Sequence, residues 1–365
     1  MRYPVAFLKY LGIVPASLAV VLLCVSAAHA QIDLSGAIAG EGSDVSIVMT
    51  PQSPGPNETI DLSVESSLLD TTDSAITWYK NGTVIAQGTG VTSASIVTGA
   101  LGKETDISVA IQTPDGTRAS TQLAIIPTET DLLVDSDSYV PPFYQGRALP
   151  SAGTNLRLEA ITHFKRPDGS VVPSSDITYT WKQDGRVVGN VSGRGKSSVE
   201  LPSPTLYGTS NIEVDAESSD DTLAGSASLS IPSTTPFVLL YEDNPLLGLT
   251  YYHALAAQTT IPDTEMTFAA VPFFAQIQSP NDPRLAYTWT VNGSAISPSA
   301  NDPSEITLNA SDSNGEADIG LGLTHSTNIF MSTSGEWDVT LGTTNSSSFG
   351  NSVTGVKDPF SGKTQ

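Results

Sequence analysis

The stretch Thr77-Trp78-Tyr79-Lys80-Asn81-Gly82 occurs in related form twice more, as Thr180-Trp181-Lys182-Gln183-Asp184-Gly185 and as Thr288-Trp289-Thr290-Val291-Asn292-Gly293. Successive tryptophans lie roughly 100 residues apart, which is a common length for one domain. The repeat therefore predicts a chain built from consecutive modules, each with one copy of the stretch.

Each copy has the pattern of a β-hairpin. Apolar and polar residues alternate up to the tryptophan, and a period of two is typical of a strand with one buried face. The Asn-Gly and Asp-Gly pairs that follow tolerate a positive φ at both central positions, as a type I′ turn requires. We therefore predict a strand, a tight turn and a return strand, the last at 83–87 in the first copy and at 186–188 in the second.

The same alternation predicts further strands in every module. In the first module they span 59–66, 93–97, 105–112 and 118–126, and about seven short strands at this spacing indicate a Greek-key sandwich. In the later modules they fall around 156–160, 212–216, 226–231, 266–274, 306–308, 317–323 and 337–341.

We expect the tryptophans to fill the sandwich cores, because a buried indole supplies a large share of a small core. This applies to Trp78, Trp181 and Trp289, and to Trp337 in the closing strand. The alternative is an exposed ring on which a ligand stacks.

A strand that ends in Trp-x-x-Asn/Asp-Gly, within a module of about 100 residues, resembles bacterial immunoglobulin-like and PKD-type surface domains. The resemblance implies three tandem immunoglobulin-like or PKD-like Greek-key sandwiches, with the tryptophan on the third strand. The paired cysteines of antibody-type domains are missing, so each core is expected to hold by packing alone. Such modules serve as spacers, adhesins and carbohydrate binders, so the resemblance is specific for architecture and not for function.

Residues 1–30 have the features of a secretion signal: basic Arg2 and Lys9, an apolar run at 11–25, and Ala28-His29-Ala30 as a cleavage site. The alternative is that this segment is retained as an anchor. A linker at 31–43 would precede sandwiches at 44–127, 128–232 and 233–341, and the Ser/Thr/Gly-rich tail 342–365 is expected to be disordered or an attachment segment. No later apolar run is long enough to span a bilayer, so no transmembrane anchor is expected in the mature chain.

The net charge of the chain limits the classes of partner that it can bind. The whole chain has a formal net charge of −22, and residues 1–30 hold two of its 16 basic residues and no acidic one, so the remainder has 14 basic and 38 acidic residues and a net charge of −24. This argues against nucleic acid or an anionic membrane as a partner and favours solubility outside the cell. Cys24 is the only cysteine, so the mature chain would contain neither a disulfide nor a cysteine-bound metal.

Catalytic motifs are missing. The sequence contains no His-Glu-x-x-His, no Gly-x-Ser-x-Gly elbow and no phosphate-binding glycine loop before a helix. The acidic residues offer many chance carboxylate pairs, and no pair stands out. We therefore expect a protein that is not an enzyme.

Calcium is the one cofactor that the sequence raises. Asp312, Asn314, Glu316 and Asp318 space oxygen ligands like the first half of a calcium loop, although the closing glutamate is missing. Two further acidic clusters lie at 131–137 and 213–221. The alternative is an Asn-Gly turn and solvated acidic loops.

Two aromatic stretches are not explained by a generic sandwich. One contains Tyr139, Phe143 and Tyr144, and the other contains Tyr241, Tyr251 and Tyr252. They are either a ligand-facing patch or packing against a neighbouring module.

These observations favour an exported structural or adhesive protein of the cell surface. Its modules would act as spacers and as protein-interaction faces, with an extracellular protein or a surface assembly as partner. The alternative is a secreted polysaccharide-binding protein that uses the two aromatic stretches. A hydrolase accessory chain is a third, weaker interpretation.

Overall fold

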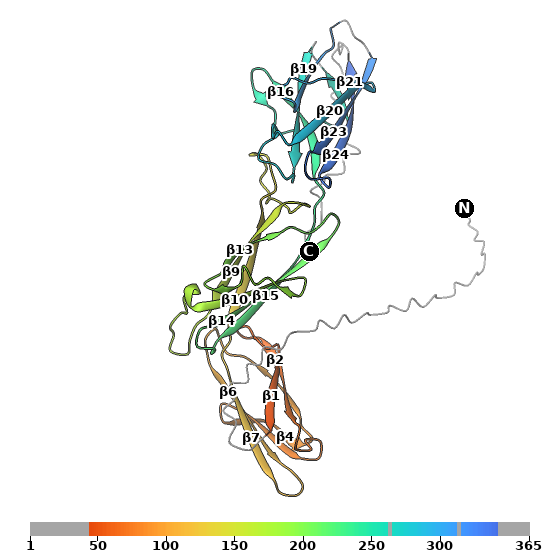
Figure 1. Ribbon diagram of the computed structural model, residues 1–365. Coiled ribbons are helices and arrows are strands. Elements are labelled where there is room, and N and C mark those ends of the chain that lie inside the picture. Colours follow the sequence, from red (N-terminus) through yellow and green to blue (C-terminus); the bar gives the residue numbers. More distant parts are fainter. Residues whose placement is uncertain (1–43, 262–264, 312–314, 342–365) are drawn as a thin grey trace, which may run out of the picture. The chain divides into compact units, whose positions relative to one another are not determined.

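The structure of the protein is a computed structural model, which describes residues 44–261, 265–311 and 315–341 (Figure 1). Within these ranges the chain forms strands β1 to β24 and one short 3-10 helix, Ser174–Asp176. The predicted all-β class is confirmed. The predicted signal, linker and tail (1–30, 31–43 and 342–365) lie outside the described residues.

The first pair of sheets comes from 45–125. One sheet has the order β1-β2-β5 and the other β4-β3-β6-β7. The strands are β1 (Val45–Thr50), β2 (Thr59–Ser66), β3 (Ala75–Lys80), β4 (Thr83–Thr89), β5 (Ser93–Val97), β6 (Thr105–Gln112) and β7 (Arg118–Ile125). Because β5 pairs with β2 and not with β4, the chain crosses between the sheets as in a Greek key.

The second pair of sheets repeats this order. Its sheets are β13-β9-β8 and β11-β10-β14-β15, and β12 also pairs with β10. The strands are β8 (Glu129–Ser136), β9 (Asn155–His163), β10 (Ile177–Gln183), β11 (Arg186–Val187), β12 (Gly193–Arg194), β13 (Ser198–Pro202), β14 (Thr209–Ser218) and β15 (Ala224–Pro232).

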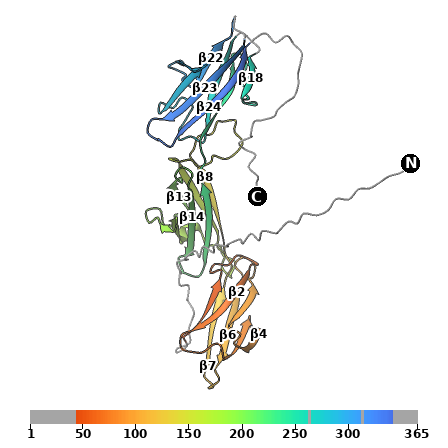
Figure 2. The ribbon, with the colours of Figure 1, turned by 90° about the vertical axis from the view of Figure 1, so that its right-hand side faces the viewer.

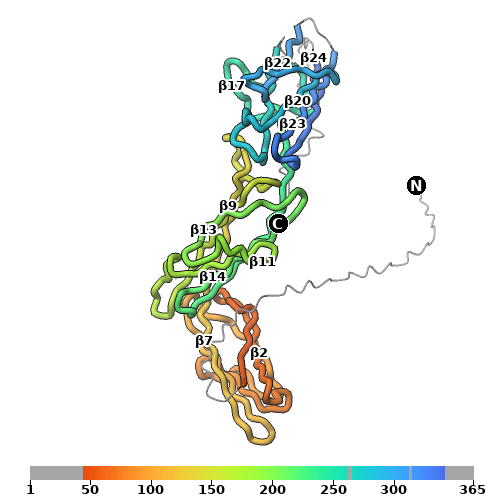
Figure 3. The backbone as a smooth tube through the Cα atoms, viewed as in Figure 1, coloured from red at the N-terminus to blue at the C-terminus, as the bar shows by residue number. Residues whose placement is uncertain are grey.

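The third pair of sheets has the same plan with two additional short strands, β17 beside β16 and β18 beside β24 (Figure 3). Its sheets are β17-β16-β19-β22 and β18-β24-β23-β20-β21, and β18 runs parallel to β24 (Figure 2). The strands are β16 (Phe237–Asn244), β17 (Gly248–Leu249), β18 (Gln258–Ile261), β19 (Glu265–Phe273), β20 (Leu285–Val291), β21 (Ser294–Ile296), β22 (Glu305–Asn309), β23 (Gly315–His325) and β24 (Ser332–Leu341).

The three predicted hairpins are confirmed as β3–β4, β10–β11 and β20–β21. Their turn residues have positive φ at both central positions, for example +52° at Asp184 and +75° at Gly185. This is the backbone that a type I′ turn requires, and Asn, Asp and Gly adopt it at least cost.

Each pair of sheets encloses one large apolar cluster with a tryptophan at its centre. Trp78, Trp181 and Trp289 are fully buried, and Trp337 on β24 is 7% exposed. The indole N–H of the first three donates to a backbone carbonyl shortly before β5, β13 and β22, respectively: on Val91 (2.8 Å), Lys196 (2.8 Å) and Pro303 (3.0 Å). Each indole therefore fills the core and also ties one sheet to the other.

Among the described residues, no helix has the length and apolar character needed to cross a membrane.

Candidate interaction surface

The long loop between β8 and β9 reaches the sheet β17-β16-β19-β22. The Tyr139 N–H donates to the Ala275 carbonyl at 2.8 Å, and the Phe274 N–H donates back to the Tyr139 carbonyl at 2.6 Å. Tyr139 and Ala275 thus form an isolated antiparallel bridge. The loop is therefore attached to this sheet through the backbone as well as through side chains.

Aromatic rings from this loop lie on the outer face of the sheet. Phe143 meets the ring of Tyr241 edge-on at 5.3 Å between centroids and stacks on Tyr251 at 5.4 Å. Tyr144 meets Phe273 and Phe274 edge-on, each at 5.8 Å. These separations lie in the favourable range for aromatic pairs.

The structure thus brings the two predicted aromatic stretches together. Tyr139, Phe143 and Tyr144 are half-buried and Tyr241 is 5% exposed. Burial raises the pKa of the Tyr139 and Tyr241 phenols, because the charged form loses its hydration. These four rings are engaged in packing, as one of the two interpretations of the stretches expects.

The hairpin from β16 to β17 and the turn after it expose apolar side chains. Leu246 is 93% exposed, Leu247 76%, Tyr251 59% and Tyr252 81%. We call these four residues the hairpin patch. The Asn244 Oδ1 accepts the N–H groups of Leu246 (3.0 Å) and Leu247 (3.2 Å), which holds the turn in place.

Sequence reasoning chose Tyr251 and Tyr252 as site residues and missed the two leucines. The available signal was Pro245-Leu246-Leu247-Gly248, since a turn with two adjacent leucines departs from the polar composition of most turns.

The surroundings of the hairpin patch are acidic. Burial raises the pKa of the Glu305 carboxyl, and the neighbouring Asp243 and Asp302 add to the effect. In the sequence from 233 to 341 the only lysine or arginine is Arg284, which pairs with Asp282 at 2.6 Å. This surface therefore repels anionic partners.

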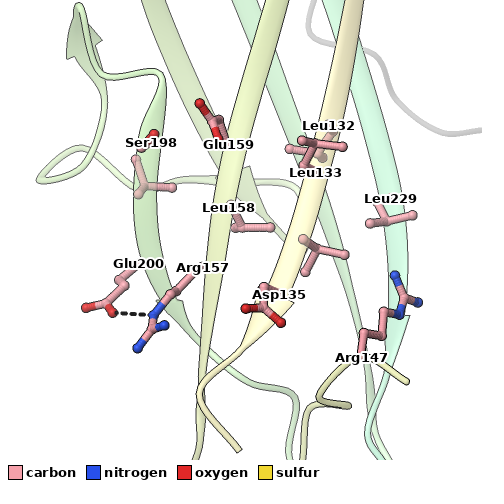
Figure 4. A pocket seen from close by; sticks show the side chains of 12 residues that line it. Leu132, Leu133, Asp135, Arg147, Arg157, Leu158, Glu159, Ser198, Glu200 and Leu229 are labelled. Carbon is pink, nitrogen blue, oxygen red and sulfur yellow. Dashed lines mark ion pairs between the residues drawn. The ribbon is translucent and has the colours of Figure 1, made fainter. Parts of the chain in front are cut away.

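A groove of about 900 Å³ lies in the second pair of sheets. Leu132 and Leu133 on β8 and Leu229 on β15 line it (Figure 4). Its apolar lining continues with Val134, Leu158 and Val199, and its charged lining comprises Asp135, Arg147, Arg157, Glu159 and Glu200. Of the charged residues, Arg157 and Glu200 form an ion pair at 3.6 Å.

Several carboxylates of the two acidic clusters at 131–137 and 213–221 pair with other side chains of the chain. Lys182 binds Glu213 at 2.9 Å and Asp215 at 2.6 Å. Asp220 pairs with Arg166 at 2.9 Å, and hydrogen bonds, the largest from the Ser218 hydroxyl, lower its pKa. In the other cluster the Asp131 carboxylate lies 3.4 Å from His163, and that of Asp137 accepts two hydrogen bonds from Asn155.

The calcium prediction rests on a segment that is only partly described. Glu316 and Asp318 are exposed on β23, whereas Asp312 and Asn314 lie outside the described residues. In the described part of the chain no three His, Cys, Asp or Glu side chains are grouped so that they could hold a metal ion. Calcium binding by the whole segment stays a prediction.

No protein-family model and no curated protein sequence matches the chain. Among solved structures, it is similar to the fibronectin(III)-like modules of CbhA from Clostridium thermocellum, with 19% identity, 52% of this chain and 94% of that chain covered, and a TM-score of 0.25. It is also similar to the central fibronectin-III array of RIM-binding protein (10% identity, 84% and 100% covered, TM-score 0.26).

A third similar structure is SGBP-B of the Bacteroides ovatus mixed-linkage glucan utilization locus, solved with a mixed-linkage heptasaccharide (15% identity, 83% and 72% covered, TM-score 0.22). Sequence identities and TM-scores this low support no conclusion about what this chain binds. The strand orders themselves make the chain an all-β array of immunoglobulin-like sandwiches in tandem.

Proposed function

We propose that this chain is an exported, non-enzymatic protein of the cell surface with a structural or adhesive role. The sandwiches at 44–127, 128–232 and 233–341 act as spacers, and the third one presents a protein-binding face. The hairpin patch carries this proposal, because clustered apolar side chains with this exposure mark interaction sites on soluble domains.

The position of the patch suits binding. Tyr251 stacks on Phe143, which is itself packed against Tyr241, so one side of the patch rests on a preformed aromatic cluster. A surface that is already ordered loses little conformational entropy when a partner binds. The acidic surroundings favour a partner that is neutral or basic at its rim.

The alternative function is polysaccharide binding through Tyr251 and Tyr252, whose exposed rings could stack on sugars. Leu246 and Leu247 fit a protein partner better, because aliphatic side chains offer a sugar no stacking face. Of the other predicted rings, Tyr241 is buried, and Tyr139, Phe143 and Tyr144 are half-buried, which leaves two largely exposed tyrosines for a glycan site.

The test is capture of partners by residues 31–365 from surface extract of the source cells. The triple variant Leu246→Ser, Leu247→Ser, Tyr252→Ser should reduce recovery of a defined protein at least about tenfold. Leu68→Ser is the matched control, since Leu68 is as exposed as Leu247 (both 76%) but lies in the loop between β2 and β3. Equal recovery with the triple variant contradicts the proposal. Recovery of polysaccharide alone, lost with Tyr251→Ala and Tyr252→Ala, favours the alternative.

A further inference from the structure

The turn between β23 and β24 binds the end of the β8–β9 loop that leads into β9. The Asn328 Nδ2 donates to the Ala152 carbonyl and to the Gln276 Oε1, each at 2.8 Å. Asn328 is 8% exposed and Ala152 is 5% exposed, so these hydrogen bonds are shielded from bulk water. Breaking them without rearrangement would leave buried polar groups unpaired, which is costly. We call Ala152, Gln276 and Asn328 the clasp.

Gly153 allows the clasp to close. Its φ is +92°, which L side chains rarely adopt, and a β-carbon there would overlap the Asn328 amide and lie 2.7 Å from the Gln276 Oε1. The other attachment of the loop is the bridge between Tyr139 and Ala275, which is next to Gln276 in the chain. The loop is thus fixed to the third pair of sheets near both of its ends, and the clasp fixes the end before β9.

A histidine at the end of β23 holds the turn that carries the clasp. The His325 Nδ1 accepts the N–H groups of Thr327 (3.3 Å) and Asn328 (3.0 Å). A ring nitrogen accepts only while it carries no proton, so the closed turn requires a neutral imidazole with its proton on Nε2. His325 is 6% exposed, and its Nε2 has no hydrogen-bond partner among the described residues. Protonation would therefore place a charge in a buried site and set an Nδ1 donor against two N–H donors.

The charged groups around His325 do not compensate for this cost. Burial lowers the His325 pKa, and the Arg284 cation adds to the effect. The Asp282 carboxylate and the Gln276 backbone act in the opposite direction, but the Asp282 charge is balanced by its ion pair with Arg284 at 2.6 Å. Two phenols in the neighbouring apolar cluster stay neutral because burial raises their pKa: Tyr139 and Tyr287. An imidazolium in the closed turn therefore gains little from its neighbours.

We propose that the clasp is a pH-sensitive contact: protonation of His325 displaces the Asn328 N–H, reorganises the β23–β24 turn and releases the β8–β9 loop at Ala152. The aromatic packing of Phe143 does not involve this turn, so the loop stays attached at its other end. The segment before β9 is then ordered above the unfolded pKa of about 6.5 and becomes mobile as the pH falls below it. This goes beyond the proposed function, since it concerns how the loop is held and not what the hairpin patch binds.

The first test is amide hydrogen exchange of residues 31–365, with rates corrected for the intrinsic effect of pH on exchange. Peptides that cover 148–155 should exchange at least about threefold faster at about pH 5 than at about pH 7.5, while peptides that cover β20 keep their protection. His325→Asn, which keeps an acceptor, should abolish this response. His163→Asn is the matched control and should respond as the parent does, because the His163 side chain is 45% exposed on β9. Unchanged exchange of 148–155 in acid overturns the proposal, as does an equal acceleration in β20, which would indicate opening of the whole sandwich.

A second test opens the clasp without changing the histidine. Asn328→Ala and, separately, Gly153→Ala should give at about pH 7.5 the fast exchange of 148–155 that the parent shows at about pH 5, and acid should then add less than about twofold. Gly169→Ala is the matched control, since φ is +91° there but a β-carbon would meet no atom closer than 4.0 Å. It should leave exchange of 148–155 unchanged. Full protection of 148–155 in both clasp variants would mean that the aromatic packing alone holds the loop, and it overturns the proposal.

Discussion

Replacing Phe143 by alanine should loosen the outer face of β16 and β19 without unfolding the sandwich. Phe143 makes two aromatic pairs, with Tyr241 and Tyr251, each worth about 0.5–1.5 kcal/mol. Loss of a half-buried phenyl ring costs roughly another 1 kcal/mol in transfer free energy. The free energy of opening should therefore fall by at least about 2 kcal/mol, which is roughly a 30-fold change in the opening equilibrium.

The assay is amide hydrogen exchange, because a chain of several sandwiches has no single unfolding free energy. Peptides that cover β16 and β19 should exchange roughly 30-fold faster in Phe143→Ala, and peptides that cover β3 and β6 should not change. Tyr252→Ala is the control, because Tyr252 is 81% exposed and its loss should change stability by less than about 0.5 kcal/mol. Unchanged exchange of β16 and β19 in Phe143→Ala would refute the packing of the β8–β9 loop on this sheet.

Three further predictions concern other parts of the chain. The His325 Nδ1 accepts the Asn328 N–H at 3.0 Å, and burial, with the Arg284 cation, lowers the His325 pKa. The stability that neutral His325 contributes should therefore be fully present above the unfolded pKa of about 6.5, and the melting temperature should fall as the pH drops below that value. His325→Asn keeps a hydrogen-bond acceptor and should remove this pH dependence. Gly185→Ala should destabilise the second pair of sheets by about 1 kcal/mol in a denaturant titration, because φ is +75° there, whereas Gly189→Ala, with equally open space and no positive φ, should be neutral. If the 312–318 segment binds calcium, millimolar calcium should raise the melting temperature and Glu316→Gln with Asp318→Asn should abolish the rise, whereas a melting temperature unmoved by calcium contradicts the calcium prediction.

The strands and hairpins were predictable because their signals are local. The alternation in 59–66 and 105–112 coincides with β2 and β6, and Asn-Gly or Asp-Gly marks each tight turn. A period of two and a turn residue with positive φ act within a few residues of chain, so no knowledge of distant segments is needed.

The added strand β18 was not predicted. Gln258–Ile261 is four residues long and mostly polar, so its alternation is too short to stand out from a loop. It exists because β24 presents a free edge to which it hydrogen-bonds. Whether an edge is occupied depends on which segments the fold brings to it, and four residues of sequence do not carry that information.

The sequence by itself determined the all-β sandwich class and the burial of Trp78, Trp181 and Trp289, because these follow from short-range periodicity and from the size of the indole. Only the tertiary structure decided what the aromatic stretches do. Phe143 and Tyr241 lie far apart in the chain, yet their rings meet at 5.3 Å, while Leu246 and Tyr252 remain in solvent. The same residue types would suit either place, and the choice is made by which sheet face the loop covers.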